Sequence, residues 1–61
     1  MLILAKFESG HSADAIIINN VVSYICLGDG DYMVTYEEPK QNYDLFDITL
    51  KHVTELKEVR L

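Results

Sequence analysis

The sequence predicts a mostly β fold: a small antiparallel barrel or meander of five to six short strands, with a short C-terminal helix as one alternative for the last segment. Three observations predict it. Turn-forming residues recur every eight to ten residues, and the segments between them are rich in β-branched and aromatic residues. A parallel arrangement would need a crossover helix, and the sequence contains no clear one. We therefore expect residues 1–61 to form a single small β domain.

The clearest local signal is a β-hairpin within residues 21–38, which read VVSYICLGDGDYMVTYEE. Two apolar runs flank Gly28-Asp29-Gly30-Asp31. An Asp-Gly pair between such runs predicts a type I′ turn, because that turn needs positive φ at both central residues. With Asp29 and Gly30 in the centre, Gly28 lies opposite Asp31 and Leu27 opposite Tyr32. A four-residue loop over Gly28–Asp31 is the alternative, and it would shift this register.

That register divides the hairpin into two faces, since residues directly opposite each other share a face. The expected core face carries Ser23, Ile25, Leu27, Tyr32, Val34 and Tyr36. The other face carries Val22, Tyr24, Cys26, Met33, Thr35 and Glu37, and it is also fairly apolar. A sheet with one solvated face does not need apolar residues on both faces. We therefore expect either a barrel or a partner that covers the second face.

The remaining strands are predicted from alternation of apolar and polar residues. Residues 2–8 place Ile3, Ala5 and Phe7 on one face. Residues 43–50 place Phe46, Ile48 and Leu50 on one face, with Tyr43, Leu45 and Asp47 on the other. Residues 13–18 contain three consecutive isoleucines and predict a further strand, followed by a tight turn at Asn19-Asn20. Pro39 ends the second strand of the hairpin.

The last segment, residues 50–61, has two interpretations. Leu50, Val53 and Leu56 are three residues apart, which suits a short amphipathic helix capped by Thr49. The alternative, which we prefer, is a turn at residues 51–53 followed by a strand over 54–60. Helices this short are marginal by themselves. The strand would place Leu56 on one face and Val59 and Leu61 on the other.

The size of the chain predicts self-association or a protein partner. A domain of 61 residues buries only about 60% of the surface of its unfolded chain. The chain has a single cysteine, Cys26, so an internal disulfide cannot stabilise it. Hydrophobic residues make up 49% of the chain, a high share for so small a domain. We therefore expect a homo-oligomer, or a partner protein that buries the excess apolar surface.

Charge and targeting signals narrow the partners further. The net charge is −5, and the five basic residues are too few and too scattered to form a patch for nucleic acid or an anionic membrane. An acidic surface of this kind suits solubility, a basic protein partner, or mimicry of nucleic acid. A single cysteine, an N-terminus without a signal peptide and the absence of a membrane-spanning run predict a cytoplasmic protein.

The opening Met1-Leu2-Ile3-Leu4, the length, and the segment from Gly30 to Lys40 resemble the carbon storage regulator family. That resemblance implies a small dimeric β protein that binds messenger RNA. The sequence departs from the family after the opening, where Ala5-Lys6-Phe7 replace basic residues, and at its end, where an acidic ELKE precedes Arg60. No functional residue is carried over from this family.

Residues that could carry chemistry are better explained as structural. Asp29 and Asp31 lack the further oxygen ligands of a calcium loop. His11 and His52 have no ligand or catalytic partner at a suitable spacing, and we expect both on the surface. Cys26 lies mid-strand without a basic neighbour that would activate its thiol. We therefore expect no catalytic residues, no metal and no cofactor, and a protein that is not an enzyme.

The functional prediction is a protein–protein interaction or self-assembling module. Its candidate interface is the second hairpin face, Val22, Tyr24, Cys26, Met33 and Thr35. Its candidate acidic contact surface is Glu37, Glu38, Asp44 and Asp47. The alternative function is an acidic inhibitor that mimics nucleic acid and blocks a nucleic-acid-binding protein. That alternative requires most of the carboxylates to lie on one face of the molecule.

Overall fold

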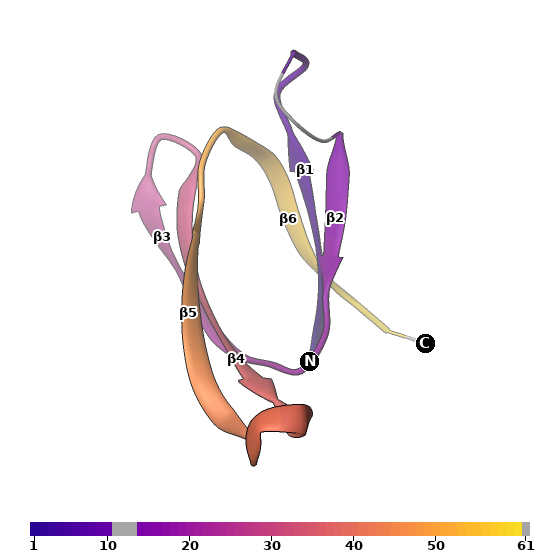
Figure 1. Ribbon diagram of the computed structural model, residues 1–61. Coiled ribbons are helices and arrows are strands. Elements are labelled where there is room, and N and C mark those ends of the chain that lie inside the picture. The colour runs from indigo at the N-terminus through magenta and orange to yellow at the C-terminus, as the bar shows by residue number, and fades with distance from the viewer. Residues whose placement is uncertain (11–13, 61) are drawn as a thin grey trace.

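A computed structural model describes residues 1–10 and 14–60, and Figure 1 shows its ribbon. The described chain forms two three-stranded antiparallel sheets, in the strand orders β2-β1-β6 and β3-β4-β5. The elements are β1 (Leu2–Phe7), β2 (Ala15–Ile18), β3 (Val21–Gly28), β4 (Asp31–Glu38), the 3₁₀ helix η1 (Pro39–Gln41), β5 (Asp44–Leu50) and β6 (Val53–Val59). The predicted all-β antiparallel fold is therefore confirmed.

The two sheets lie on opposite sides of an open ring, with their inner faces turned toward each other (Figure 1). Tight connections link β2 to β3 and β5 to β6, but neither pair forms a ladder within the described residues, so the barrel is not closed. The inner faces share one core of buried side chains, to which both sheets contribute: Ile3, Ala5, Val21, Val34, Leu50 and Val53.

Alternation along β1 builds the first sheet as predicted. Ile3 and Ala5 are fully buried, and Phe7 packs partly against the same core. The neighbouring strands supply the inward partners, because Ile18 lies opposite Ile3 and both Ile16 and Leu56 lie opposite Ala5. Small Ala5 suits a central strand flanked by larger side chains, since the layers then interdigitate.

Backbone hydrogen bonds join the two sheets at their ends. Met1 and Val21 exchange a pair of bonds: the amide of Val21 donates to the Met1 carbonyl at 2.8 Å, and the N-terminal ammonium donates to the Val21 carbonyl at 2.7 Å. At the other end, the Val53 amide donates to the Gly30 carbonyl at 2.9 Å. These bonds satisfy backbone groups where the ladders stop.

The β3–β4 hairpin has the predicted turn but not the predicted register. Asp29 and Gly30 have φ values of 50° and 82°, as a type I′ turn requires. Gly28 lies opposite Asp31, as expected, but Tyr32 lies opposite Cys26 and not opposite Leu27. The prediction was wrong because a bulge beside Gly28, whose φ is 106°, inserts Leu27 as an extra residue.

This one-residue shift exchanges the two faces of β3 relative to β4, because side chains alternate along a strand. Val34 is fully buried and lies opposite Tyr24, whereas the sequence predicted Ile25 there. Ile25 lies opposite Met33 and is 57% exposed. A second bulge near Val22 returns β3 to the inner face at Val21, which is buried and lies opposite Tyr36, a residue predicted on that face.

Strand β5 confirms the predicted alternation at the other side of β4. Phe46, Ile48 and Leu50 point to the core side, opposite Tyr36, Val34 and Tyr32 in turn. The Tyr36 and Phe46 rings stack with centroids 5.9 Å apart, a geometry that adds to apolar burial. The polar loop after β4 forms η1, which begins with Pro39, and the Glu38 carboxylate accepts from the Lys40 amide at 3.3 Å.

The last segment is a turn followed by a strand, as preferred from the sequence, and not a C-terminal helix. His52 takes the left-handed conformation with φ of 62°, and β6 begins at Val53. Leu56 lies inward opposite Ala5, and Val59 lies outward opposite Leu2. Three predictions fall outside the described residues. They are the placement of Leu61 on the Val59 face, the surface position of His11, and the start of the 13–18 segment.

The open ring leaves more surface exposed than a compact monomer of this mass would have. The accessible area is 4422 Å² for a chain of 7.0 kDa, against about 4,000 Å² expected for a folded monomer. The radius of gyration is 11.7 Å, against about 10.5 Å expected for 61 residues. The chain is therefore less compact than a typical folded monomer of its mass.

Candidate functional site

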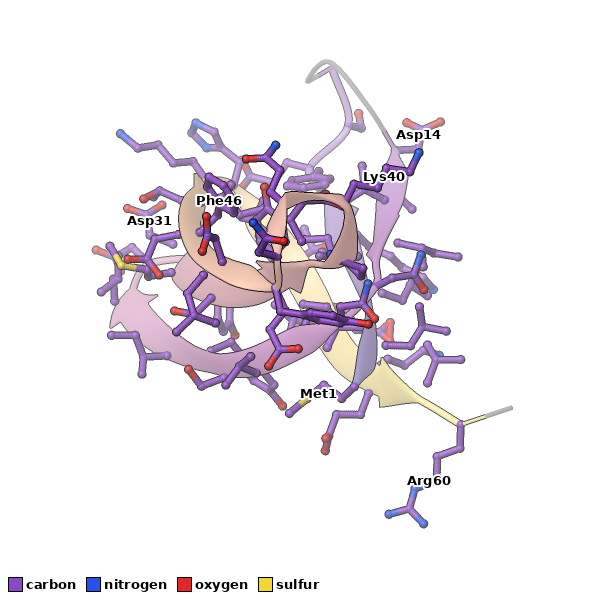
Figure 2. All side chains as sticks on the ribbon, turned by 60° about the horizontal axis from the view of Figure 1, so that its bottom comes forward. Met1, Asp14, Asp31, Lys40, Phe46 and Arg60 are labelled. Atoms are coloured by element: carbon purple, nitrogen blue, oxygen red, sulfur yellow. The ribbon has the colours of Figure 1, made fainter. Side chains whose placement is uncertain are left out.

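Each sheet has an outer face that no other described element covers, and side chains stand on the outward side of both sheets (Figure 2). Alternation and register define the two faces. The β4 face consists of Ser23, Ile25, Asp31, Met33, Thr35, Glu37, Leu45, Asp47 and Thr49. The β1 face consists of Leu2, Leu4, Lys6, Ala15, Ile17, Glu55, Lys57 and Val59.

The β4 face combines exposed apolar side chains with carboxylates. Ile25 and Leu45 are 57% and 61% exposed, on the two strands that flank β4. Half-buried Met33 lies between Ile25 and Thr49 in one cross-strand row. Large apolar side chains that stay half in water on adjacent strands are typical of a surface that becomes covered by a partner.

A short hydrogen bond organises the centre of this face. Thr35 donates from Oγ1 to Oδ1 of Asp47 at 2.6 Å, across the β4–β5 ladder. The bond is exposed to solvent, so its contribution to stability is modest. Its effect on the site is to hold the Asp47 carboxylate against the sheet, between the row of Ile25, Met33 and Thr49 and the pair of Glu37 and Leu45.

The residues of the candidate interface do not share one face. Met33 and Thr35 belong to the β4 face, whereas Tyr24 and Cys26 lie on the inner side, opposite Val34 and Tyr32. Val22 lies in the second bulge of β3 and is 47% exposed. The bulge at Leu27 explains the error, because it moves every residue of β3 from Ser23 to Cys26 to the opposite face.

Sequence reasoning missed the two most exposed apolar residues of the β4 face, Ile25 and Leu45, as interface residues. Ile25 was expected in the core, and its exposure follows from the bulge. Leu45 was expected on the other side of its strand from Phe46, Ile48 and Leu50, and this placement is confirmed. Alternation in β5 alone could have marked Leu45 as an exposed apolar residue.

The four candidate acidic contact residues separate in the same way. Glu37 and Asp47 lie on the β4 face, with Glu37 opposite Leu45. Glu38 and Asp44 lie opposite each other on the inner side of the ladder, at the end beside η1. The structure thus places Glu37, Glu38 and Asp44 near one end of the β4–β5 pair and Asp47 at its centre, and it divides the four between the two sides of the sheet.

Apolar side chains also lie at the centre of the β1 face. Leu4 lies between Ile17 and Lys57, and Leu2 lies beside Val59. Ile17 is 60% exposed, a fraction close to that of Ile25 on the other sheet. The β1 face therefore has an apolar centre as the β4 face does.

The charged groups of the β1 face form a short row across β1 and β6. Lys6 Nζ lies 3.4 Å from one carboxylate oxygen of Glu55, and Lys57 Nζ lies 4.0 Å from the other. Half-exposed ion pairs of this kind contribute little to stability. They leave this face with two ammonium groups and one carboxylate, and so with a net positive charge.

Cys26 and Tyr32 form a cross-strand pair near the hairpin turn. Cys26 is an exposed free thiol. The Cys26 thiolate raises the pKa of Tyr32 above its ordinary value of 10.0, with smaller contributions from desolvation and from a hydrogen bond to the same sulfur. A nearby negative charge raises the pKa of a tyrosine because it disfavours the charged phenolate form.

Replacing Cys26 by serine should lower the pKa of Tyr32 toward 10, because serine carries no negative charge at high pH. NMR titration of the tyrosine ring signals measures this, with Tyr43 at the far end of the sheet as the internal control. In the wild type, the raised pKa means that the folded state keeps this proton longer than the unfolded state. Stability should therefore fall as the pH rises above 10, and less so in the variant. An unchanged Tyr32 titration in Cys26→Ser would contradict this assignment.

His52 has a partner that its sequence neighbours did not indicate. Its Nδ1 lies 3.3 Å from a carboxylate oxygen of Glu8, and the Glu8 amide donates to the His52 carbonyl at 2.9 Å. Both side chains are exposed, and the pair ties the end of β1 to the β5–β6 turn. Among residues 1–10 and 14–60, no three His, Cys, Asp or Glu side chains gather as a metal site would require.

Within the described part of the chain, no helix is long and apolar enough to cross a membrane. Comparisons with protein-family models, with curated proteins and with solved structures gave no match to this chain.

Proposed function

We propose that the chain is a non-enzymatic interaction module of the cytoplasm that assembles with further copies of itself through its outer sheet faces. The observation that carries this proposal is the exposure of large apolar side chains on both faces, above all Ile17, Ile25 and Leu45 at 57–61%. Isolated exposed hydrophobic residues are ordinary on protein surfaces. Here Ile17 lies beside Leu4 and Ile25 lies beside Met33, on sheets that no other described element covers.

Covering these faces would supply free energy that the small core lacks. Fully burying an exposed aliphatic side chain contributes about 1.5–3 kcal/mol, so a half-exposed one contributes about 1 kcal/mol when covered. The described core has only six buried side chains, and of these only Ile3, Ala5 and Val34 are fully buried. Small domains without disulfides or metals commonly reach stability by oligomerisation.

Removing apolar side chains from the β4 face tests this function. We expect the double variant Ile25→Ser/Leu45→Ser to self-associate about tenfold or more weakly, since each loss costs about 1 kcal/mol. Sedimentation velocity over a range of concentrations measures the change. The matched control is Gln41→Ser, an exposed polar position in η1 that lies on neither face. The proposal fails if the double variant and the control associate as strongly as the wild type.

The alternative function, an acidic inhibitor that mimics nucleic acid, has less support. Its carboxylates would need to follow one face at the spacing of phosphates. Asp29 lies in the hairpin turn, Glu38 beside η1 at the other end, and Glu55 on the β1 face between two lysines. This separation supports a surface charge that keeps the chain soluble, together with the local acidic patch of the β4 face.

A further inference from the structure

We infer that copies of this chain associate head to tail, with the β1 face of one copy against the β4 face of the next. The inference rests on the proposed self-assembly and specifies its geometry. The two faces belong to opposite sides of the ring and point away from each other (Figure 1). A contact between two different faces leaves one of each kind free at the ends of the assembly.

Charge favours this pairing over the two symmetric alternatives. The β4 face carries the carboxylates of Asp31, Glu37 and Asp47 and no basic side chain. Two β4 faces packed together would therefore juxtapose six carboxylates, a repulsive arrangement. The β1 face carries Lys6 and Lys57 around Glu55. Two β1 faces would repel mildly, whereas a β1 face against a β4 face brings opposite charges together.

The apolar groups of the two faces are matched in kind and position. Ile17 lies on edge strand β2 with 60% exposure, and Ile25 lies on edge strand β3 with 57% exposure. Each is flanked on the central strand by a half-buried apolar residue, Leu4 beside Ile17 and Met33 beside Ile25. Stacked sheets pack at about 10 Å through such side chains. A three-stranded face is small, so the contact belongs to the weak class that buries less than about 1,200 Å².

Two variants with one blocked face each make the geometry testable. Ile17→Glu adds a carboxylate to the β1 face, which would meet the acidic β4 face. Ile25→Lys adds an ammonium to the β4 face, which would meet the basic β1 face. Each variant alone should sediment at the monomer mass of 7.0 kDa. An equimolar mixture should associate again, because the β4 face of the first variant and the β1 face of the second remain intact.

The outcomes separate this geometry from self-assembly in general. If either variant alone still associates as the wild type does, the contact is symmetric and the head-to-tail geometry is wrong, while self-assembly stands. If the wild type associates but the mixture of folded variants stays monomeric, the geometry is also wrong. If the wild type is monomeric up to about 1 mM, beyond the range of specific weak complexes, self-assembly itself fails.

Circular dichroism and thermal unfolding verify that both variants are folded. If one is not, Lys57→Glu replaces the β1-face variant and Leu45→Lys the β4-face variant, since both positions are exposed. The same mixture test then applies, with the same supporting and contradicting outcomes.

Discussion

Replacing Ile3 by alanine should lower the free energy of unfolding by about 2–5 kcal/mol, the largest loss we expect from a single core substitution. Ile3 is fully buried in the central strand β1, where it lies between Ile18 of β2 and Glu58 of β6. A domain of this length has only about 3–9 kcal/mol of stability in total. The variant should therefore be partly or wholly unfolded at 37 °C, as urea denaturation at low protein concentration would show.

The matched control is Ile17→Ala on the adjacent strand. Ile17 is the same residue type in the same sheet but is 60% exposed on the β1 face. Its replacement should cost less than about 1 kcal/mol of unfolding free energy, because no cavity forms. Equal losses in the two variants would show that the inner faces of the sheets do not form the core.

Replacing Gly30 by alanine should be the second severe substitution, with an expected loss of about 2–4 kcal/mol. Gly30 has φ of 82°, a conformation that costs a residue with a side chain about 1–2 kcal/mol. A Cβ at this position would also lie 2.9 Å from the carbonyl oxygen and 3.3 Å from the amide nitrogen of Val53. Those atoms are backbone, so the contact between the hairpin turn and β6 would have to open. Chemical denaturation measures the loss.

The control for Gly30 is the neighbouring glycine of the same hairpin. Gly28 also has positive φ, 106°, but a Cβ there would meet nothing within 4 Å. Gly28→Ala should therefore show the cost of backbone strain alone, about 1–2 kcal/mol. If both variants lost the same stability, the close approach of Gly30 to Val53 would have no energetic role.

Much of this fold could be predicted from short-range patterns. Alternation at Ile3, Ala5 and Phe7, and at Phe46, Ile48 and Leu50, identified the inner faces of β1 and β5, because residues two apart share one side of a strand. The Asp29-Gly30 turn also followed from local geometry, since its positive φ values favour this pair.

The register of the hairpin could not be predicted in the same way. Gly28 was included in the predicted turn, yet its positive φ also permits a bulge that takes Leu27 out of the ladder. Both arrangements satisfy the local sequence, and packing of Val34 and Tyr24 against the other sheet decides between them. The second bulge, at Val22, has no glycine to mark it.

The candidate site was only partly predictable for the same reason. The expectation that both faces of the hairpin are apolar led to an interface on one of them, but the bulge redistributed its residues. Met33 and Thr35 remain on an outer face, and Ile25 and Ser23 lie opposite them in the places expected for Cys26 and Tyr24. The β1 face was not foreseen as a surface of interest, because the pairing of Leu4 with Ile17 and with Lys57 depends on strand order.

The central claim is that the outer faces associate because the chain is too small to cover them itself. Sedimentation equilibrium of the wild type tests it most directly. The weight-average mass should rise continuously above 7.0 kDa with concentration, reaching and exceeding the mass of a dimer at about 1 mM, as a weak interface would give. A mass that stays at 7.0 kDa throughout that range would contradict the claim.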